Sequence, residues 1–185
     1  MEPGESTRNR LLVSVPATGD DNFDKSVVYV IDHDEAGAIG VILNRPTEDG
    51  IPEALDLGIP WATPGHLFSG GPVSPEALIL LGRRQLGAEP RGTAPIGGAV
   101  AVVAADAVEQ GEVGGLDFLR AYSGYAGWGA AQLDAELGAG VWTVADALPD
   151  DVFSARPERL WREVLTRQGG RLAALARHPD DPSSN

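Results

Sequence analysis

The chain carries two strand-like segments that are joined by only a few residues. Residues 26 to 33 (SVVYVIDH) and 37 to 44 (GAIGVILN) are rich in Val, Ile and Tyr, which favour strands. The connection, residues 34 to 37 (DEAG), contains turn-forming Asp and a glycine that can adopt a positive φ. The pattern predicts an antiparallel β-hairpin, so the fold must contain a sheet with antiparallel pairing.

Further strand and helix signals surround this hairpin. Helices are predicted over residues 52 to 58, over residues 128 to 137 from the spacing of Leu133 and Leu137, and from Pro157 onward until Gly169 and Gly170. Strands are predicted at residues 11 to 15, 66 to 69, 77 to 82, 98 to 104, 118 to 124 and 141 to 145.

This order of elements favours an α+β fold. A regular parallel α/β sheet needs steadier alternation of strands and helices, and a chain of 185 residues fits one domain. The two ends are polar and lack periodicity. We therefore expect a disordered N-terminal arm over residues 1 to 10, a single domain with a mixed sheet over residues 11 to 177, and a disordered tail over residues 178 to 185.

Composition excludes several kinds of chemistry. The absence of cysteine removes disulfides, thiolate zinc sites, iron-sulfur clusters and cysteine nucleophiles. No stretch approaches the ~20 consecutive apolar residues of a membrane span, and the N-terminus lacks the apolar run of a signal peptide. We expect a cytoplasmic protein with no membrane association and no cofactor.

The net charge of −13 makes direct nucleic-acid binding unlikely, because a phosphate backbone is bound by Lys and Arg. The charge is uneven, since residues 156 to 177 contain six Arg and two Glu, a local charge of +4 against −17 for the rest. This segment could face an acidic partner or nucleic acid, but charge runs are mostly solvated or paired within the same protein. We favour pairing with the protein's own acidic surface.

Three motifs partly match ligand-binding patterns. Residues 127 to 132 (GWGAAQ) resemble a dinucleotide-binding loop, but Gln132 stands where a third glycine belongs. Residues 32 to 37 resemble the start of a calcium loop, but Leu43 replaces the acidic residue that completes it. Asp20, Asp21 and Asp24 could hold a metal, although a capped turn explains them as well. We predict no metal site.

No motif for nucleophilic catalysis is present. The chain has three histidines, no Gly-x-Ser-x-Gly elbow and no His-Glu-x-x-His helix. His33 follows strand residues with apolar side chains, which favours a hydrogen-bonded histidine at the margin of the core. No catalytic residue is predicted from these patterns.

Several short segments, in a fixed order over some 150 residues, resemble the AlgH/YqgE proteins of bacteria. The resemblance implies an α+β fold whose mixed strands curl into a barrel-like sheet with flanking helices. For function it implies a cytoplasmic regulator, because one branch of the family is named for regulation of alginate synthesis, and it supplies no catalytic residue. The segments include DNF (21–23), SVVY (26–29), NRP (44–46), SGGPV (69–73) and GYAGW (124–128), followed by Gln132, Leu133, Glu136, Leu137, Trp142, Arg159 and Trp161.

The same segments define a candidate ligand site at the ends of the predicted elements. Polar groups on loops that a rigid sheet supports often form binding sites. Turn geometry is the alternative explanation, since Asn, Gly and Pro set turns and aromatic residues fill cores. The candidate residues are Asp21, Asn22, Asn44, Arg45, Gly70, Gly71, Tyr125, Trp128 and Gln132.

Three functions remain open at this point. The first is a non-enzymatic regulatory or adaptor protein that acts through a protein partner or a small-molecule ligand. The second is a small-molecule or nucleotide enzyme that uses the candidate site, with Asp21 or His33 as acid or base. The third is a transcriptional regulator that binds DNA directly, which the acidic charge and the missing helix-turn-helix pattern disfavour. The sequence does not fix the oligomeric state.

Overall fold

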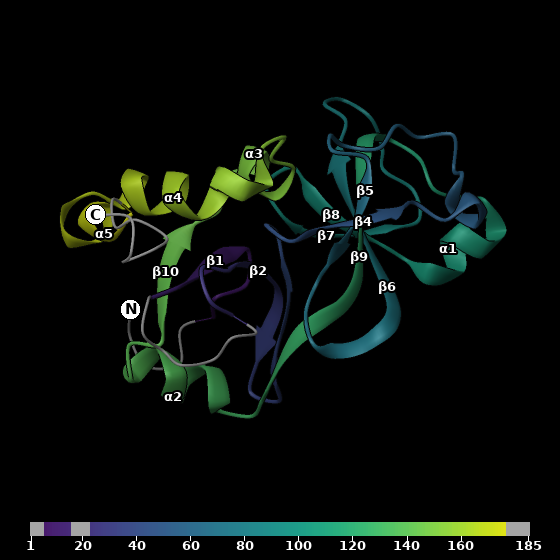
Figure 1. Cartoon of the computed structure of the whole chain (residues 1–185). Coiled ribbons are helices and arrows are strands. Elements are labelled where there is room, and N and C mark those ends of the chain that lie inside the picture. Colours follow the sequence, from purple (N-terminus) through teal and green to yellow (C-terminus); the bar gives the residue numbers. More distant parts are fainter. Residues whose placement is uncertain (1–5, 16–22, 177–185) are drawn as a thin grey trace.

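The computed structural model describes residues 6 to 15 and 23 to 176, and shows a curled sheet with helices on both of its faces (Figure 1). The strands are β1 (Arg10–Ser14), β2 (Val27–Asp34), β3 (Gly37–Ile42), β4 (Pro46–Gly50), β5 (His66–Ser69), β6 (Val73–Arg84), β7 (Thr93–Gly97), β8 (Val100–Val103), β9 (Leu116–Gly129) and β10 (Trp142–Asp146). The helices are η1 (Glu53–Leu55), α1 (Ala105–Gln110), α2 (Gln132–Gly138), α3 (Pro149–Val152), α4 (Pro157–Gln168) and α5 (Gly170–Leu175).

The strands form a continuous sheet in the order β10-β1-β2-β3-β9-β6-β8-β7, with β4 and β5 outside this path. All pairings between named strands are antiparallel except β5 with β9, so the sheet is mixed. The predicted hairpin is β2–β3, which closes with Asp34 opposite Gly37. The α+β class and the curled sheet expected from the sequence are confirmed.

The long strand β9 joins the two parts of the sheet. Residues 126 to 129 pair with β3, and residues between 116 and 125 pair with β6. The predicted strand over 118 to 124 is therefore too short, and the predicted helix start at Trp128 is wrong. Trp128 lies opposite Ala38 on β3, and the chain turns only at Ala131, which has a φ of 58°. The helical spacing of Leu133 and Leu137 belongs to α2 alone.

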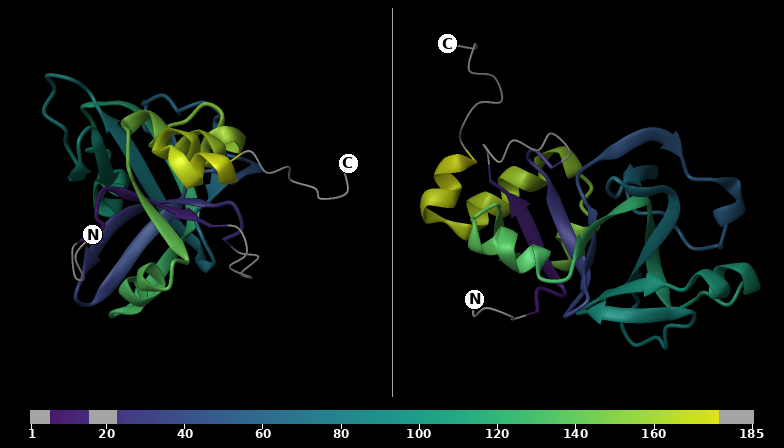
Figure 2. Two further views of the ribbon diagram at one scale, coloured as in Figure 1. Left: turned by 90° about the vertical axis from the view of Figure 1, so that its left-hand side faces the viewer. Right: turned by 90° about the horizontal axis from the view of Figure 1, so that it is seen from below.

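Helices cover both faces of the β10-β1-β2 region. In Figures 1 and 2, α4 lies on one face of these strands and α2 on the other. Alternate residues of β1 accordingly enter different cores, because Leu11 packs in the same cluster as Leu160 and Val164 of α4, whereas Leu12 packs with Leu133 of α2. Residues 11 to 13 of β1 and 27 to 30 of β2 are fully buried, which explains why these parts of the two strands are continuously apolar.

A third core lies at the other end of the sheet, where residues of β6 and β9 pack against α1 and the segment around η1. The helix predicted over residues 52 to 58 is only the 3-10 turn η1. The sequence analysis missed β4, β7, α1 and α3. These elements have four to six residues each, too few to establish a periodic pattern. No helix among the described residues is long and apolar enough to cross a membrane.

The predicted chain ends are described only in part. Residues 1 to 5 and 177 to 185 lie outside the described residues. Of the expected N-terminal arm, Arg10 begins β1 and Thr7 is fully buried next to β2. The C-terminal helix begins at Pro157 as expected, and Gly169 separates it from α5.

Candidate functional site

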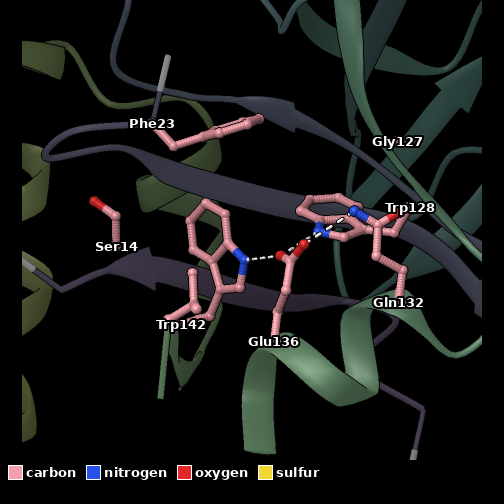
Figure 3. A pocket seen from close by; sticks show the side chains of 8 residues that line it. Ser14, Phe23, Gly127, Trp128, Gln132, Glu136 and Trp142 are labelled. Carbon is pink, nitrogen blue, oxygen red and sulfur yellow. Dashed lines mark hydrogen bonds between the residues drawn. The ribbon is translucent and has the colours of Figure 1, made fainter. Parts of the chain in front are cut away.

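A pocket of about 270 Å³ opens where α2 faces the ends of β9 and β10 (Figure 3). Three aromatic rings and one carboxylate dominate it. Its lining residues are Ser14, Phe23, Gly127, Trp128, Gln132, Glu136, Val141 and Trp142.

Three donors hold the carboxylate of Glu136 in this pocket. The indole N–H groups of Trp142 and Trp128 donate to its Oε2 atom, with N–O distances of 2.7 Å and 2.9 Å. The side-chain amide of Gln132 donates to Oε1 at 2.9 Å. Since all three donors are neutral, they orient the carboxylate but leave its charge uncompensated.

The start of α2 fixes the position of this carboxylate. The side-chain oxygen of Gln132 accepts the backbone N–H of Gly129 at 3.0 Å, which ties the first turn of α2 to the end of β9. Gln132 and Glu136 are four residues apart and therefore lie on the same face of the helix. This spacing is the signal in the sequence that could have drawn attention to Glu136.

The aromatic rings meet edge to face. Phe23 and Trp142 have ring centroids 5.4 Å apart with an interplanar angle of 77°, and Trp128 and Trp142 are 5.9 Å apart at 76°. Trp128 and Trp142 are at least nine-tenths buried, whereas Phe23 is partly exposed. Rings in this arrangement form corners that suit flat or cationic groups.

The pocket is negatively charged. Its lining residues include no Lys, Arg or His, and no ion pair among the described residues involves Glu136. The described part of the chain also contains no group of three His, Cys, Asp or Glu side chains that could hold a metal ion. A ligand of this pocket would therefore meet aromatic rings and one carboxylate.

Only two of the residues predicted as a ligand site, Trp128 and Gln132, line this pocket. Asp21 and Asn22 lie outside the described residues. Glu136 and Trp142 belong to the segments that resemble the family, but they are absent from the predicted site because neither stands in a predicted loop.

Asn44 and Arg45 contact the backbone near the start of β2. The side chain of Asn44 accepts the N–H of Val27 and donates to the carbonyl of Lys25, at 3.0 Å and 2.9 Å. The guanidinium of Arg45 donates to the carbonyl of Asp24 at 3.2 Å. These contacts match the turn-forming alternative that the sequence analysis left open.

Gly70 and Gly71 lie where the chain passes close to β9. A Cβ atom on Gly71 would lie 2.2 Å from the backbone of Tyr125, and one on Gly70 would lie 2.3 Å from the carbonyl oxygen of Gly124. Glycine is required at both positions by this backbone contact. Tyr125 itself is partly buried against the main core.

His33 is hydrogen bonded through its Nδ1 atom. The backbone N–H of Thr7 donates to Nδ1 at 3.1 Å, and the hydroxyl of Thr7 lies 2.9 Å from the same atom. In a neutral imidazole the proton is then on Nε2. This is the hydrogen-bonded histidine at the core margin that the sequence predicts.

The Arg-rich C-terminal segment forms contacts within the molecule. Arg167 pairs with Asp151 through both of its terminal nitrogens, at 2.9 Å and 2.7 Å. Arg156 pairs with Glu163 at 3.0 Å, and Arg162 donates to the carbonyl of Ala176. The contact of Arg167 with Asp151 is of the predicted kind, a pairing of this segment with the protein's own acidic surface.

The protein is a single-domain α+β protein of the half-barrel type. Its curled, mostly antiparallel sheet carries helices on both faces and a pocket around Glu136. The family model described as AlgH-like (DUF179) matches residues 11–173, and the chain belongs to this family. The resemblance seen in the sequence is thereby confirmed.

Relatives match this chain along nearly its whole length. A UPF0301 protein of Streptomyces avermitilis is 44% identical over 193 residues, which covers 100% of this chain and 98% of the relative. A crystal structure from Corynebacterium diphtheriae has a TM-score of 0.84 and 26% identity, covering 96% of this chain and 95% of that one. The solution structure of AlgH from Pseudomonas aeruginosa has a TM-score of 0.68 and 28% identity, covering 98% of both chains.

Proposed function

We propose that this protein is a non-enzymatic, cytoplasmic regulatory or adaptor protein, and that it acts by binding a ligand in the pocket around Glu136. One observation carries the proposal. A carboxylate is held in place by three neutral donors and remains without a cation among the described residues, beside a pocket that a small group can enter. Preorganised polar groups in a mostly apolar pocket are the usual features of a ligand site.

The alternative of an enzyme has less support. The sequence analysis suggested His33 or Asp21 as acid or base, but Nδ1 of His33 accepts a backbone hydrogen bond from Thr7. No histidine is among the described residues that line the pocket, and the hydroxyl of Ser14 in this lining accepts the N–H of Ser26 at 2.8 Å. Binding is therefore the function that the geometry favours.

Indole resonances provide a direct test of this proposal. Trp128 and Trp142 donate to Glu136, whereas Trp161 donates to the carbonyl of Ser14 at 3.0 Å from a buried position. Labelled protein would be titrated with pools of nucleotides, amines, sugars and organic acids. We expect at least one pool to shift the indole N–H signals of Trp128 and Trp142, while the Trp161 signal stays in place.

The control is a Trp142→Phe variant, which removes one donor and keeps an aromatic ring. The Trp161 signal reports whether this variant is folded. We expect the response to the active pool to weaken in the variant. If no pool shifts the two indole signals, or if shifts occur elsewhere and are unchanged in the folded variant, the pocket is not the binding site and the proposal fails.

A further inference from the structure

We infer that the pocket around Glu136 binds a quaternary, fully methylated ammonium group. This inference rests on the proposed binding function and names its ligand chemistry. It starts from the charge of the pocket, because the described residues that line it include the carboxylate of Glu136 and no cationic side chain. An anionic group such as a phosphate would be repelled by Glu136 and would find no Arg or Lys to bind.

The aromatic walls favour a cation over a neutral group. Phe23 packs against Trp142 and Trp142 against Trp128 at interplanar angles of 77° and 76°, and all three rings line the pocket. Ring faces attract cations through the ring quadrupole, and Trp is the strongest partner. The protein's overall charge of −13 also raises the local concentration of cations around the molecule.

Hydrogen-bonding capacity selects among cations. Oε2 of Glu136 already accepts two indole N–H groups, and Oε1 accepts the amide of Gln132. A primary ammonium has three N–H donors that need acceptors, and a guanidinium has five. The carboxylate of Glu136 can accept few further hydrogen bonds. A quaternary ammonium has no N–H group, so it needs only the rings and the negative charge.

The size of the pocket agrees with a small head group. Its volume of about 270 Å³ is near the lower end of the range for ligand sites, which is roughly 300–1,000 Å³. A trimethylammonium head is small enough for such a volume. The group could belong to a free small molecule or to a methylated lysine on a peptide.

The test compares choline with 3,3-dimethyl-1-butanol, which has the same shape but carbon in place of the charged nitrogen. Both would be titrated into labelled protein with the indole signals of Trp128 and Trp142 as readout. We expect choline to bind at least about tenfold more tightly than the neutral alcohol and more tightly than ethanolamine, whose head is a primary ammonium. Equal affinity for the alcohol would show a merely apolar pocket and would overturn the inference.

A pair of variants separates the charge of Glu136 from the total charge of the protein. Glu136→Gln keeps the size of the side chain and an oxygen that accepts hydrogen bonds, while Asp134→Asn removes the same charge at an exposed position of α2 outside the pocket lining. We expect choline affinity to fall about tenfold in Glu136→Gln and to remain within about twofold in Asp134→Asn. Equal affinities in the two variants would contradict the inference.

The outcomes also separate this inference from the proposed function. If choline leaves the indole signals unchanged but another pool shifts them, the ligand class is wrong and the binding function stands. If neither choline nor any pool shifts them, both fail. The last experiment uses a short peptide with one trimethyllysine. If the peptide binds at least about tenfold more tightly than choline, the ammonium group belongs to a protein. If it binds equally or more weakly, the ligand is a free small molecule.

Discussion

Arg120 has the largest fully buried side chain among the described residues, and it connects two loops to β9. Its Nη2 donates to the carbonyl of Thr63 at 2.6 Å and its Nη1 to the carbonyl of Ser154 at 3.0 Å. Its guanidinium also lies 4.5 Å from the ring centroid of Phe68. No carboxylate among the described residues pairs with it, and burial lowers its pKa. The guanidinium is stabilised here by carbonyls and one ring.

Replacing Arg120 tests whether its hydrogen bonds to the two loops stabilise the fold. In Arg120→Met the carbonyls of Thr63 and of buried Ser154 lose their donor, and this cost outweighs the gain from removing a buried charge. We expect the free energy of unfolding in urea to fall by about 2–4 kcal/mol.

The control is Arg83→Met, on the neighbouring strand. Arg83 pairs with exposed Asp150 and lies over Phe118 at the surface. We expect this change to cost less than about 1 kcal/mol. Equal losses in the two variants would show that the carbonyls of Thr63 and Ser154 do not depend on Arg120.

Single residues also show why the candidate site was only partly predictable. Asn44 and Gly71 satisfy backbone geometry, whereas Trp128 and Gln132 line a pocket, yet all four stand near element ends in the sequence. Glu136 belongs to the segments that resemble the family, but it is not predicted as a site residue, because a polar residue on a helix is usually a solvated one. Glu136 is recognised as a site residue only in the folded chain, where two indoles from different strands lie close to its carboxylate.

Longer elements were easier to predict than short ones. The β2–β3 hairpin and α4 follow from apolar runs and from Pro and Gly at their boundaries. The helix start at Trp128 was misplaced because glycines at positions 127 and 129 were interpreted as a loop, while pairing with β3 keeps them in a strand. Sheet pairing between distant segments therefore overrides the local pattern.

The contact between α3 and α4 depends on one ion pair. The carboxylate of Asp151 is largely buried, accepts two bonds from Arg167, and also accepts the N–H of Leu148 at the start of α3 at 2.8 Å. The hydrogen bonds that Arg167 donates to Asp151 raise the pKa of Arg167. The pair fixes α3 against the middle of the molecule.

We expect Arg167→Ala to lower the free energy of unfolding by about 1–2 kcal/mol, because it leaves a buried carboxylate without its cation. Amide exchange in α3 should become faster. Arg156→Ala is the matched control, since the Arg156–Glu163 pair on the same helix is exposed, and we expect it to cost less than about 0.5 kcal/mol. Unchanged exchange in α3 would show that the ion pair does not hold this helix.

The stability of the whole protein should depend on alkaline pH through two buried tyrosines. Tyr29 donates to Asn9 at 2.8 Å, and Tyr122 is close to the carbonyl of Val152 at 3.4 Å. Burial raises the pKa of both hydroxyls above the ordinary value of 10.0. The unfolded chain therefore loses these protons at a lower pH than the folded protein does.

The direction in which stability changes with pH follows from this difference in pKa. The stabilisation is complete below pH about 10 and is lost as the pH rises, by about 1.4 kcal/mol per pH unit for each tyrosine. Denaturant unfolding between pH 9 and about 11.5 measures the slope. We expect Tyr29→Phe combined with Tyr122→Phe to flatten it, and an unchanged slope in a folded double variant would assign the alkaline loss to other groups.

Strand β9 limits how such a fold can exchange parts during evolution. One end of this strand carries Trp128 and pairs with β3, while the other end pairs with β6 and carries Arg120. A gene fragment that encoded either half of the sheet alone would supply only part of the strand that both halves need. Within the described residues any boundary between the two parts of the sheet would cut β9, which accords with a relative whose alignment covers 100% of this chain and 98% of that relative.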